Sequence, residues 1–152
     1  MPTTTTSLPA PACTCGRLRR AARALTQLYD DLMEPSGLRV TQFSLLRTLA
    51  TQESARMSDL AKTQLLDRTA LSRTLDPLVD RGLVAITPGR DARTREVSLT
   101  QAGTRALRSA TPHWQRAQSQ VAARIGVNKL DTLIATLAEV EQLHPDAGGV
   151  AR

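Results

Sequence analysis

A change of hydrophobic period near the middle of the chain constrains the fold more than any other feature. Apolar residues recur every three or four positions through 41–49, 57–64 and 68–81, the spacing of one face of an α-helix. The helical period then ends. The short stretches Leu83–Ile86 and Glu96–Leu99 flank a segment rich in turn-forming residues, as in a β-hairpin. The pattern therefore predicts a mainly α-helical fold in which three helices precede a small β-hairpin.

Residues with capping preferences mark where these helices begin and end. Asp67 is expected to cap the helix 68–81, and Gly82 to end it in the left-handed conformation that glycine tolerates. Pro77 lies inside this helix and should remove one backbone hydrogen bond, with a slight kink. Hydroxyl side chains are expected to cap the remaining helices, at Thr41, Ser58 and Thr100.

Further helical periods lie on both sides of this central unit. One helix is predicted over 16–33, and a last one from Val127 or Asn128 to 143. Between them, a long helix is predicted over 101–124, interrupted near Thr111–Pro112. The apolar stripes of these helices lie outside the central unit. We expect them to be buried against a second copy of the chain, or against one another as an ordinary helical subdomain.

The helices 57–64 and 68–81 are separated by a tight turn, which is the spacing of a helix-turn-helix. With the hairpin that follows, they predict a winged helix-turn-helix, in which the second helix enters the major groove of DNA. Asp76 and Asp80, near the end of that helix, would repel phosphate, so contact is expected in its first two turns only. Its polar residues there are Arg68, Thr69, Ser72 and Arg73.

The hairpin tip supplies a second set of cations. Arg90, Arg93 and Arg95 lie within a few residues of one another, and arginine is favoured in a narrow minor groove. Asp91 is expected to orient Arg93 through a charge-assisted hydrogen bond. A charged tip that is simply solvated is the alternative, and the adjacent helix-turn-helix favours DNA contact.

The net charge agrees with a nucleic-acid partner without establishing one. The 152 residues include 20 Lys and Arg against 14 Asp and Glu, a net charge of +6. Residues 53–100, however, contain eight basic and seven acidic groups, so the predicted DNA-binding segment is nearly neutral. The placement of particular arginines, and not the total charge, supports the prediction.

These observations suggest an organisation of the whole chain. We expect the winged helix-turn-helix to span 37–100 and a helical dimerisation region to combine 16–36 with 101–144. Residues 1–15 are expected to form a disordered leader, and 145–152 a flexible tail. No run of 18 apolar residues exists, and residues 1–12 lack the basic start and apolar stretch of a signal peptide. A cytoplasmic protein with no membrane partner is therefore expected.

Three stretches resemble the MarR family of bacterial transcriptional regulators: Met57–Ala61, Leu71–Val84 and Asp91–Gly103. The most specific part is the Asp-x-Arg sequence of the hairpin followed by Val-x-Leu-Thr-x-x-Gly. The resemblance covers about residues 16–143. It implies a homodimer built from the first and last helices that binds a pseudo-palindromic double-stranded DNA operator. It also implies a repressor that is released by a ligand or by oxidation.

The two cysteines permit more than one interpretation. Cys13 and Cys15 stand just before the first predicted helix, where a thiolate is favoured, so a peroxide sensor that passes through sulfenic acid to a disulfide is one possibility. The organic-hydroperoxide repressors, a subfamily of the MarR family, look similar. They combine a reactive cysteine at this position with a tyrosine fourteen residues later, as Cys15 and Tyr29 do here. The second tyrosine of that arrangement is replaced by Val40.

A metal or metalloid site is the second interpretation of the thiols. Cys13 and Cys15 from two subunits would suit a soft ion such as arsenite, copper or zinc. His113 and His144 lack the spacing of a conventional zinc site, and no metal or cofactor is assigned. The remaining interpretation is that both thiols are incidental residues of a flexible leader.

The sequence also bears on three other functional possibilities. An organic acid that induces release is one possible ligand, with Arg20, Arg23 and Arg47 as candidate carboxylate partners, although solvated arginines would look the same. An enzyme is not expected, because two histidines and the absence of a glycine-rich phosphate loop leave no nucleophile–base arrangement. A winged helix that binds protein would expose an apolar recognition face, whereas the helix 68–81 offers polar residues there.

Overall fold

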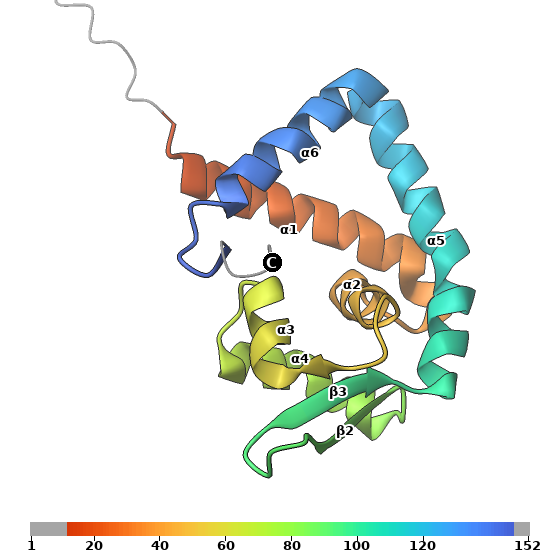
Figure 1. Ribbon diagram of the computed structural model, residues 1–152. Helices are drawn as coiled ribbons and strands as arrows, with labels where there is room; N and C mark the ends of the chain where they lie inside the picture. Colours follow the sequence, from red (N-terminus) through yellow and green to blue (C-terminus); the bar gives the residue numbers. More distant parts are fainter. Residues whose placement is uncertain (1–11, 148–152) are drawn as a thin grey trace, which may run out of the picture.

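The computed structural model describes residues 12–147, in which a small antiparallel sheet lies at one edge of a mainly helical molecule (Figure 1). The predicted class, mainly helical with a small β element, is confirmed. In chain order the elements are α1 (Thr14–Met33), the 3-10 helix η1 (Glu34–Ser36), α2 (Val40–Leu49), β1 (Ala55–Arg56), α3 (Met57–Thr63), α4 (Arg68–Asp80), β2 (Val84–Pro88), β3 (Arg95–Leu99), α5 (Gln101–Ile125) and α6 (Val127–Glu141).

The sheet has three strands in the order β1–β3–β2. The hairpin pairs Val84 with Leu99 and Pro88 with Arg95, so each strand is slightly displaced from its predicted limits. The short strand β1 was not predicted. It spans two residues, too few to show a period, and it exists because Ala55 pairs with Val97 far along the chain.

The core joins α2, α4 and the sheet. Leu46, Leu71, Leu75 and Val97 are fully buried, and each such side chain contributes about 1.5–3 kcal/mol relative to an exposed one. This packing fixes the rotation of α4, because its apolar stripe faces α2 and the sheet. The polar side of α4 is thereby turned outward.

Several predicted caps are confirmed. The carboxylate of Asp67 accepts a hydrogen bond from the backbone N–H of Ala70 at 2.8 Å, and the hydroxyl of Thr100 accepts one from Gly103 at 3.0 Å. Gly82 has a φ of 68°, the left-handed region that glycine adopts without strain. Pro77 lies within α4 as expected, and the helix continues to Asp80.

Three predicted boundaries are wrong. α1 begins at Thr14 with Cys13 as its N-cap, two residues before the predicted start. α2 begins at Val40 and follows Arg39, so Thr41 lies inside the helix, while Ser58 lies inside α3. The predicted start of α2 is wrong because a side chain from another helix determines where α2 begins. Asp30 of α1 accepts the backbone N–H of Val40 at 2.8 Å and satisfies a donor that a local hydroxyl would otherwise have to meet.

The predicted interruption of the long helix is also wrong, because α5 is continuous from Gln101 to Ile125 with Pro112 inside it. A proline in a helix removes one hydrogen bond from the ladder. Buried Ala110 and Ala117 lie on either side of Pro112, so packing of α5 holds the helix across the gap. Thr111 adds a hydrogen bond from its hydroxyl to the carbonyl of Leu107 at 2.8 Å.

The terminal helices form an open frame beside the core. α1 and α5 pack on each other, and α5 leads from the sheet to α6, which runs back toward α1 (Figure 1). α6 buries no residue within the described chain, and Ile134 on it is 60% exposed. The helical frame is therefore only partly covered by a single copy.

Candidate nucleic-acid interface

The turn between α3 and α4 sets the position of the second helix. Leu65 has a φ of 50°, an unusual value for a residue with a side chain, and it reverses the chain immediately after α3. The backbone N–H of Leu66 then bonds to the carbonyl of Ala61 at 2.9 Å. Asp67 follows as the cap, so α4 begins directly at Arg68. The local sequence thus forms the helix-turn-helix that its spacing predicts.

The first two turns of α4 place their polar residues outside the core. Arg68, Thr69 and Arg73 are exposed and Ser72 is half-buried, while Leu71 between them is fully buried. The outward face of α4 therefore begins with cationic and hydroxyl groups at the positive end of the helix dipole. Asp76 and Asp80 are exposed farther along.

The hairpin tip is held by its own hydrogen bonds. Two backbone hydrogen bonds of Thr94 close the tip, both at 2.8 Å. The carbonyl of Thr94 accepts the N–H of Gly89, and the N–H of Thr94 donates to the carbonyl of Asp91. A side chain at Gly89 would meet the hydroxyl of Thr94, so a larger residue there would have to displace that side chain. Asp91 does not contact the guanidinium of Arg93 as predicted. Its carboxylate accepts the backbone N–H of Arg93 at 3.1 Å, and so shapes the turn that displays the arginine.

A cleft of about 370 Å³ brings the hairpin and the helix-turn-helix together. Arg93 and Arg95 of the hairpin line it with Arg68 at the start of α4. Three further polar residues were missed in the sequence: Arg56, Ser58 and Lys62, from β1 and α3. No local pattern marks them, because only the fold brings α3 beside the hairpin. The cleft is thus lined by five cationic side chains, with Asp146 as its one carboxylate.

The remaining candidates for DNA contact lie outside the lining of this cleft. Thr69, Ser72 and Arg73 are on the outward side of α4, and Arg90 and Asp91 are exposed at the hairpin tip. The predicted residues therefore fall into two groups. One group lines the cleft, and the other occupies the helix face and tip on either side of it.

The cysteine and tyrosine candidates are not brought together within one chain. Cys13 and Cys15 are exposed at the start of α1, where the sulfur of Cys13 accepts the backbone N–H of Gly16 at 3.4 Å. Tyr29 lies on the same helix, about 21 Å from Cys15 at a rise of about 1.5 Å per residue. Its hydroxyl donates to the side-chain oxygen of Gln118 on α5, and burial raises the pKa of this tyrosine.

The inducer candidates are also separate. Arg47 on α2 lies over the ring of Trp114, with its guanidinium carbon 4.5 Å from the ring centroid, and this ring stacks on Phe43. Arg47 thus packs α2 against α5, whereas Arg20 and Arg23 are exposed on α1.

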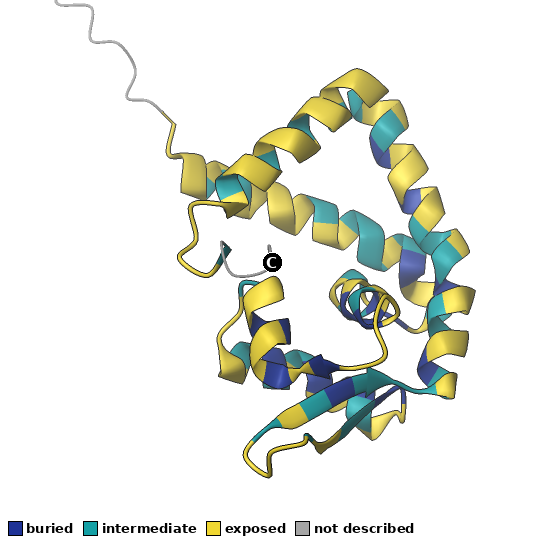
Figure 2. Ribbon diagram, in the orientation of Figure 1, coloured by how far each residue is buried: buried dark blue, intermediate teal, exposed yellow. Residues whose placement is uncertain are grey.

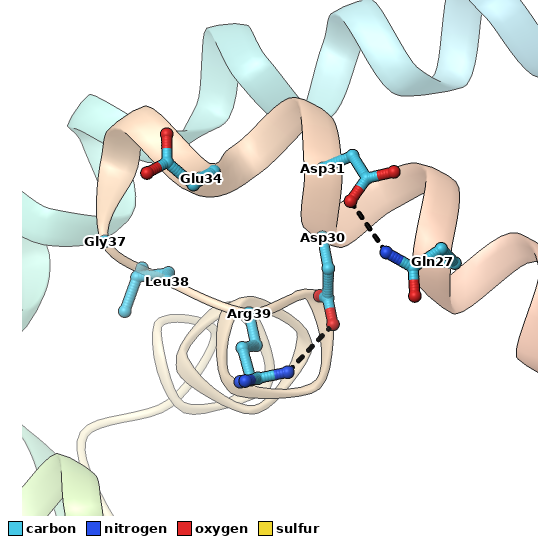
Figure 3. A pocket seen from close by; sticks show the side chains of 7 residues that line it. All are labelled: Gln27, Asp30, Asp31, Glu34, Gly37, Leu38 and Arg39. Atoms are coloured by element: carbon cyan, nitrogen blue, oxygen red, sulfur yellow. Dashed lines mark hydrogen bonds and ion pairs between the residues drawn. The ribbon is translucent and has the colours of Figure 1, made fainter.

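A pocket of about 520 Å³ occurs where α1 ends and α2 begins (Figure 3). The carboxylate of Asp30 already has two partners there: it accepts the backbone N–H of Val40 and forms an ion pair with Arg39 at 3.4 Å. Asp31 accepts a hydrogen bond from Gln27 at 2.7 Å. Glu34 also lines the pocket, so three carboxylate side chains contribute to its wall.

Two further properties concern ligands and membranes. Within residues 12–147, no three His, Cys, Asp or Glu side chains gather as a metal site would require. Among the same residues, none of the helices combines the length and the hydropathy needed to span a bilayer.

Comparison with known proteins identifies the family. The family model named MarR matches residues 38–94, which include the helix-turn-helix and the hairpin tip. The transcriptional regulator MosR from M. tuberculosis, solved in complex with DNA, is 38% identical, with a TM-score of 0.80. The match covers 87% of this chain and 96% of MosR. The chain belongs to the MarR family. Its general role is accordingly that of a transcriptional regulator, and its relatives are regulators and not enzymes.

Two other structures of this fold contain a bound molecule, operator DNA in one and a coenzyme A thioester in the other. A variant of MarR from E. coli in complex with operator DNA is 25% identical, with a TM-score of 0.74, over 82% of this chain and 91% of that one. CouR from Rhodococcus jostii RHA1, bound to p-coumaroyl-CoA, is 24% identical, with a TM-score of 0.74, over 89% and 96%. The second likeness concerns the fold alone.

Proposed function

We propose that this MarR-family protein is a cytoplasmic repressor that binds a pseudo-palindromic DNA operator as a homodimer. The observation that carries the proposal is the cationic cleft, in which the start of α4 and the hairpin face the same space. Thr69 and Arg73 on the outward side of α4 would meet base edges in the major groove. Arg93 would reach the minor groove, and Arg56, Lys62 and Arg68 would hold phosphates between the two.

Homodimerisation is supported by the helical frame. α6 buries no residue within the described chain, and Val127 and Ile134 on it are 62% and 60% exposed. An amphipathic helix that buries none of its apolar side chains in one copy favours a protein partner. A two-fold axis would also place two copies of α4 about one turn of DNA apart, which matches an operator with two half-sites.

A gel-shift titration with fragments of the DNA flanking its own gene would test this function. We expect a fragment with two inverted half-sites to bind far more tightly than a scrambled fragment of equal length. Arg73→Ala should lower this preference, because the variant loses a base contact, whereas Lys62→Gln should weaken binding to both fragments equally. Equal binding of the two fragments by the wild-type protein would contradict a sequence-specific operator.

Release by a small organic acid is the regulation that we propose. A groove of about 540 Å³ between α1 and α5 is lined mainly by apolar residues such as Leu25, Leu28 and Val121, with Arg124 at its edge. Its size is within the range of about 300–1,000 Å³ that ligand pockets occupy. Aromatic carboxylates are suitable probes, and Arg124→Gln should abolish any release that they cause while leaving DNA binding intact. Release from the variant at wild-type concentrations would refute this site.

A thiol switch is the second candidate, and the capping role of Cys13 favours it. A peroxide would oxidise one thiolate to sulfenic acid and leave as an alcohol. The second thiol would then displace water and form the Cys13–Cys15 disulfide. Residues two apart in a helix point to different sides, so the bond would unwind the first turn of α1 and remove the cap at Gly16. A soft metal ion held by these thiols from two subunits is the other form of this proposal.

The thiols can be tested separately from the organic acid. Cumene hydroperoxide should release wild-type protein from operator DNA but not the Cys13→Ser/Cys15→Ser variant. Arsenite or copper applied to the same two proteins distinguishes metal binding from oxidation. If both proteins respond alike to every treatment, the cysteines have no sensory role.

A further inference from the structure

The charges on α1 are arranged against the helix dipole. Its first half contains four arginines and its first turn has no acidic residue, whereas Asp30 and Asp31 lie at its C-terminal end, where the last turn has no basic residue. The dipole favours the opposite arrangement, with anions at the N-terminus and cations at the C-terminus. The charges of α1 therefore do not stabilise the helix through its dipole.

One exposed face of α1 places half of these charges, Arg17, Arg20 and Asp31, in a single line. Its members are spaced alternately by three and four residues, which places them on one side of a helix, and all of them are exposed (Figure 2). Glu34 continues the line because its backbone is still helical, with φ −46° and ψ −45°. We call this face the charged stripe, and its residues are Arg17, Arg20, Ala24, Gln27, Asp31 and Glu34.

The charged stripe is complementary to itself when it is reversed. It is symmetric about the point between Leu25 and Thr26, so an antiparallel copy would set Arg17 opposite Glu34 and Arg20 opposite Asp31. The small Ala24 would lie opposite Gln27 at the centre. Because a two-fold interface repeats every contact, each charge pair would occur twice.

These charges have no such partners inside one chain. Within residues 12–147 the one ion pair is that of Arg39 with Asp30, neither of which belongs to the charged stripe. Arg17 and Asp31 are about 21 Å apart along the helix, so they cannot meet without a second molecule. The acidic end of the stripe borders the pocket shown in Figure 3, which leaves open space beside Asp31 and Glu34 for arginine side chains.

We propose that two copies of the protein align their α1 helices antiparallel through the charged stripe, which fixes the register of the dimer. This inference rests on the proposed homodimer and adds its geometry. The occupant of the face is a second copy of this chain, because the face complements its own reverse. A different acidic or basic partner would satisfy only one half of it.

Reversing the charges of the stripe tests the register. The dissociation constant of the dimer is measured by analytical ultracentrifugation at low salt. One variant is Arg17→Glu/Arg20→Glu, and the other is Asp31→Lys/Glu34→Lys. In each variant, four attractive contacts per dimer become repulsive. We therefore expect the dissociation constant of the dimer to be about 10- to 100-fold higher than in the wild type. The effect should shrink in 1 M salt, where the screening length is about 3 Å. Arg73→Glu/Arg90→Glu lowers the net charge as much as the first variant, but away from the helical frame, and should dimerise like the wild type.

Mixing the two reversed variants gives the decisive result. Each copy then meets an opposite charge at both ends, so the mixture should form heterodimers with nearly wild-type affinity, although neither variant associates well alone. If the separate variants dimerise as tightly as the wild type, or if mixing restores nothing, the antiparallel register is wrong while the homodimer stands. A wild-type protein that is monomeric at every concentration would overturn both.

Discussion

Arg56→Gln is the most informative single substitution, because no local sequence pattern pointed to this residue and the fold places it in the cationic cleft. Five cationic side chains line the cleft in one copy. Three of them, Arg56, Lys62 and Arg68, are assigned to phosphates, so six contacts per dimer contribute about −5.4 to the slope of log affinity against log salt. Arg56→Gln removes two of these contacts, so the slope should become less steep by about 1.8. Glutamine keeps most of the packing of the aliphatic stem.

The assay is a fluorescence-anisotropy titration of labelled duplex at several salt concentrations between about 50 and 200 mM, the range over which such contacts are strongly screened. The change should be the same for the operator and for a scrambled duplex, because a phosphate contact has no sequence preference. Arg108→Gln on the exposed side of α5 is the matched control and should leave the slope unchanged. An unchanged slope for Arg56→Gln would show that Arg56 makes no phosphate contact.

Three further substitutions test other parts of the account. Arg93→Ala should weaken operator binding by about 1–3 kcal/mol in the same titration, and wild-type affinity would remove this side chain from the interface. Gly103→Val should destabilise the fold by about 1–3 kcal/mol in urea unfolding, since any side chain there meets the carbonyl of Leu83; an unchanged midpoint would contradict this contact. Burial raises the pKa of Tyr29, so the folded state favours the neutral phenol and loses stability as the pH rises above the ordinary value of 10.0. Tyr29→Phe should therefore show a smaller loss of stability between pH 9 and 11 than the wild type, and equal losses would refute this assignment.

The parts of the fold that were predictable are those set by neighbouring residues. Asp67 and Gly82 delimit α4 through contacts within a few positions, so its start at Arg68 was predicted correctly and its end only one residue too late. The hairpin was predictable for the same reason, because Gly89 and Thr94 close its tip locally. These elements contain every residue that was nominated for DNA contact.

The parts that were missed depend on distant contacts. The start of α2 is fixed by Asp30, ten residues earlier on another helix, and β1 exists only because β3 pairs with it. Arg56 and Lys62 join the candidate site because α3 packs beside the hairpin, and no period records that. Likewise, Pro112 marks a break in the sequence, but burial of the helix around it outweighs one lost hydrogen bond.

Hydroxyl-radical footprinting of the operator tests the central claim most directly, namely that the start of α4 and the hairpin together bind a two-fold DNA site. The account predicts two protected half-sites about one helical turn apart, flanked by minor-groove protection. The flanking protection should disappear in Arg93→Ala while the central protection remains. A single protected segment without two-fold symmetry, or flanks that stay protected in the variant, would contradict it.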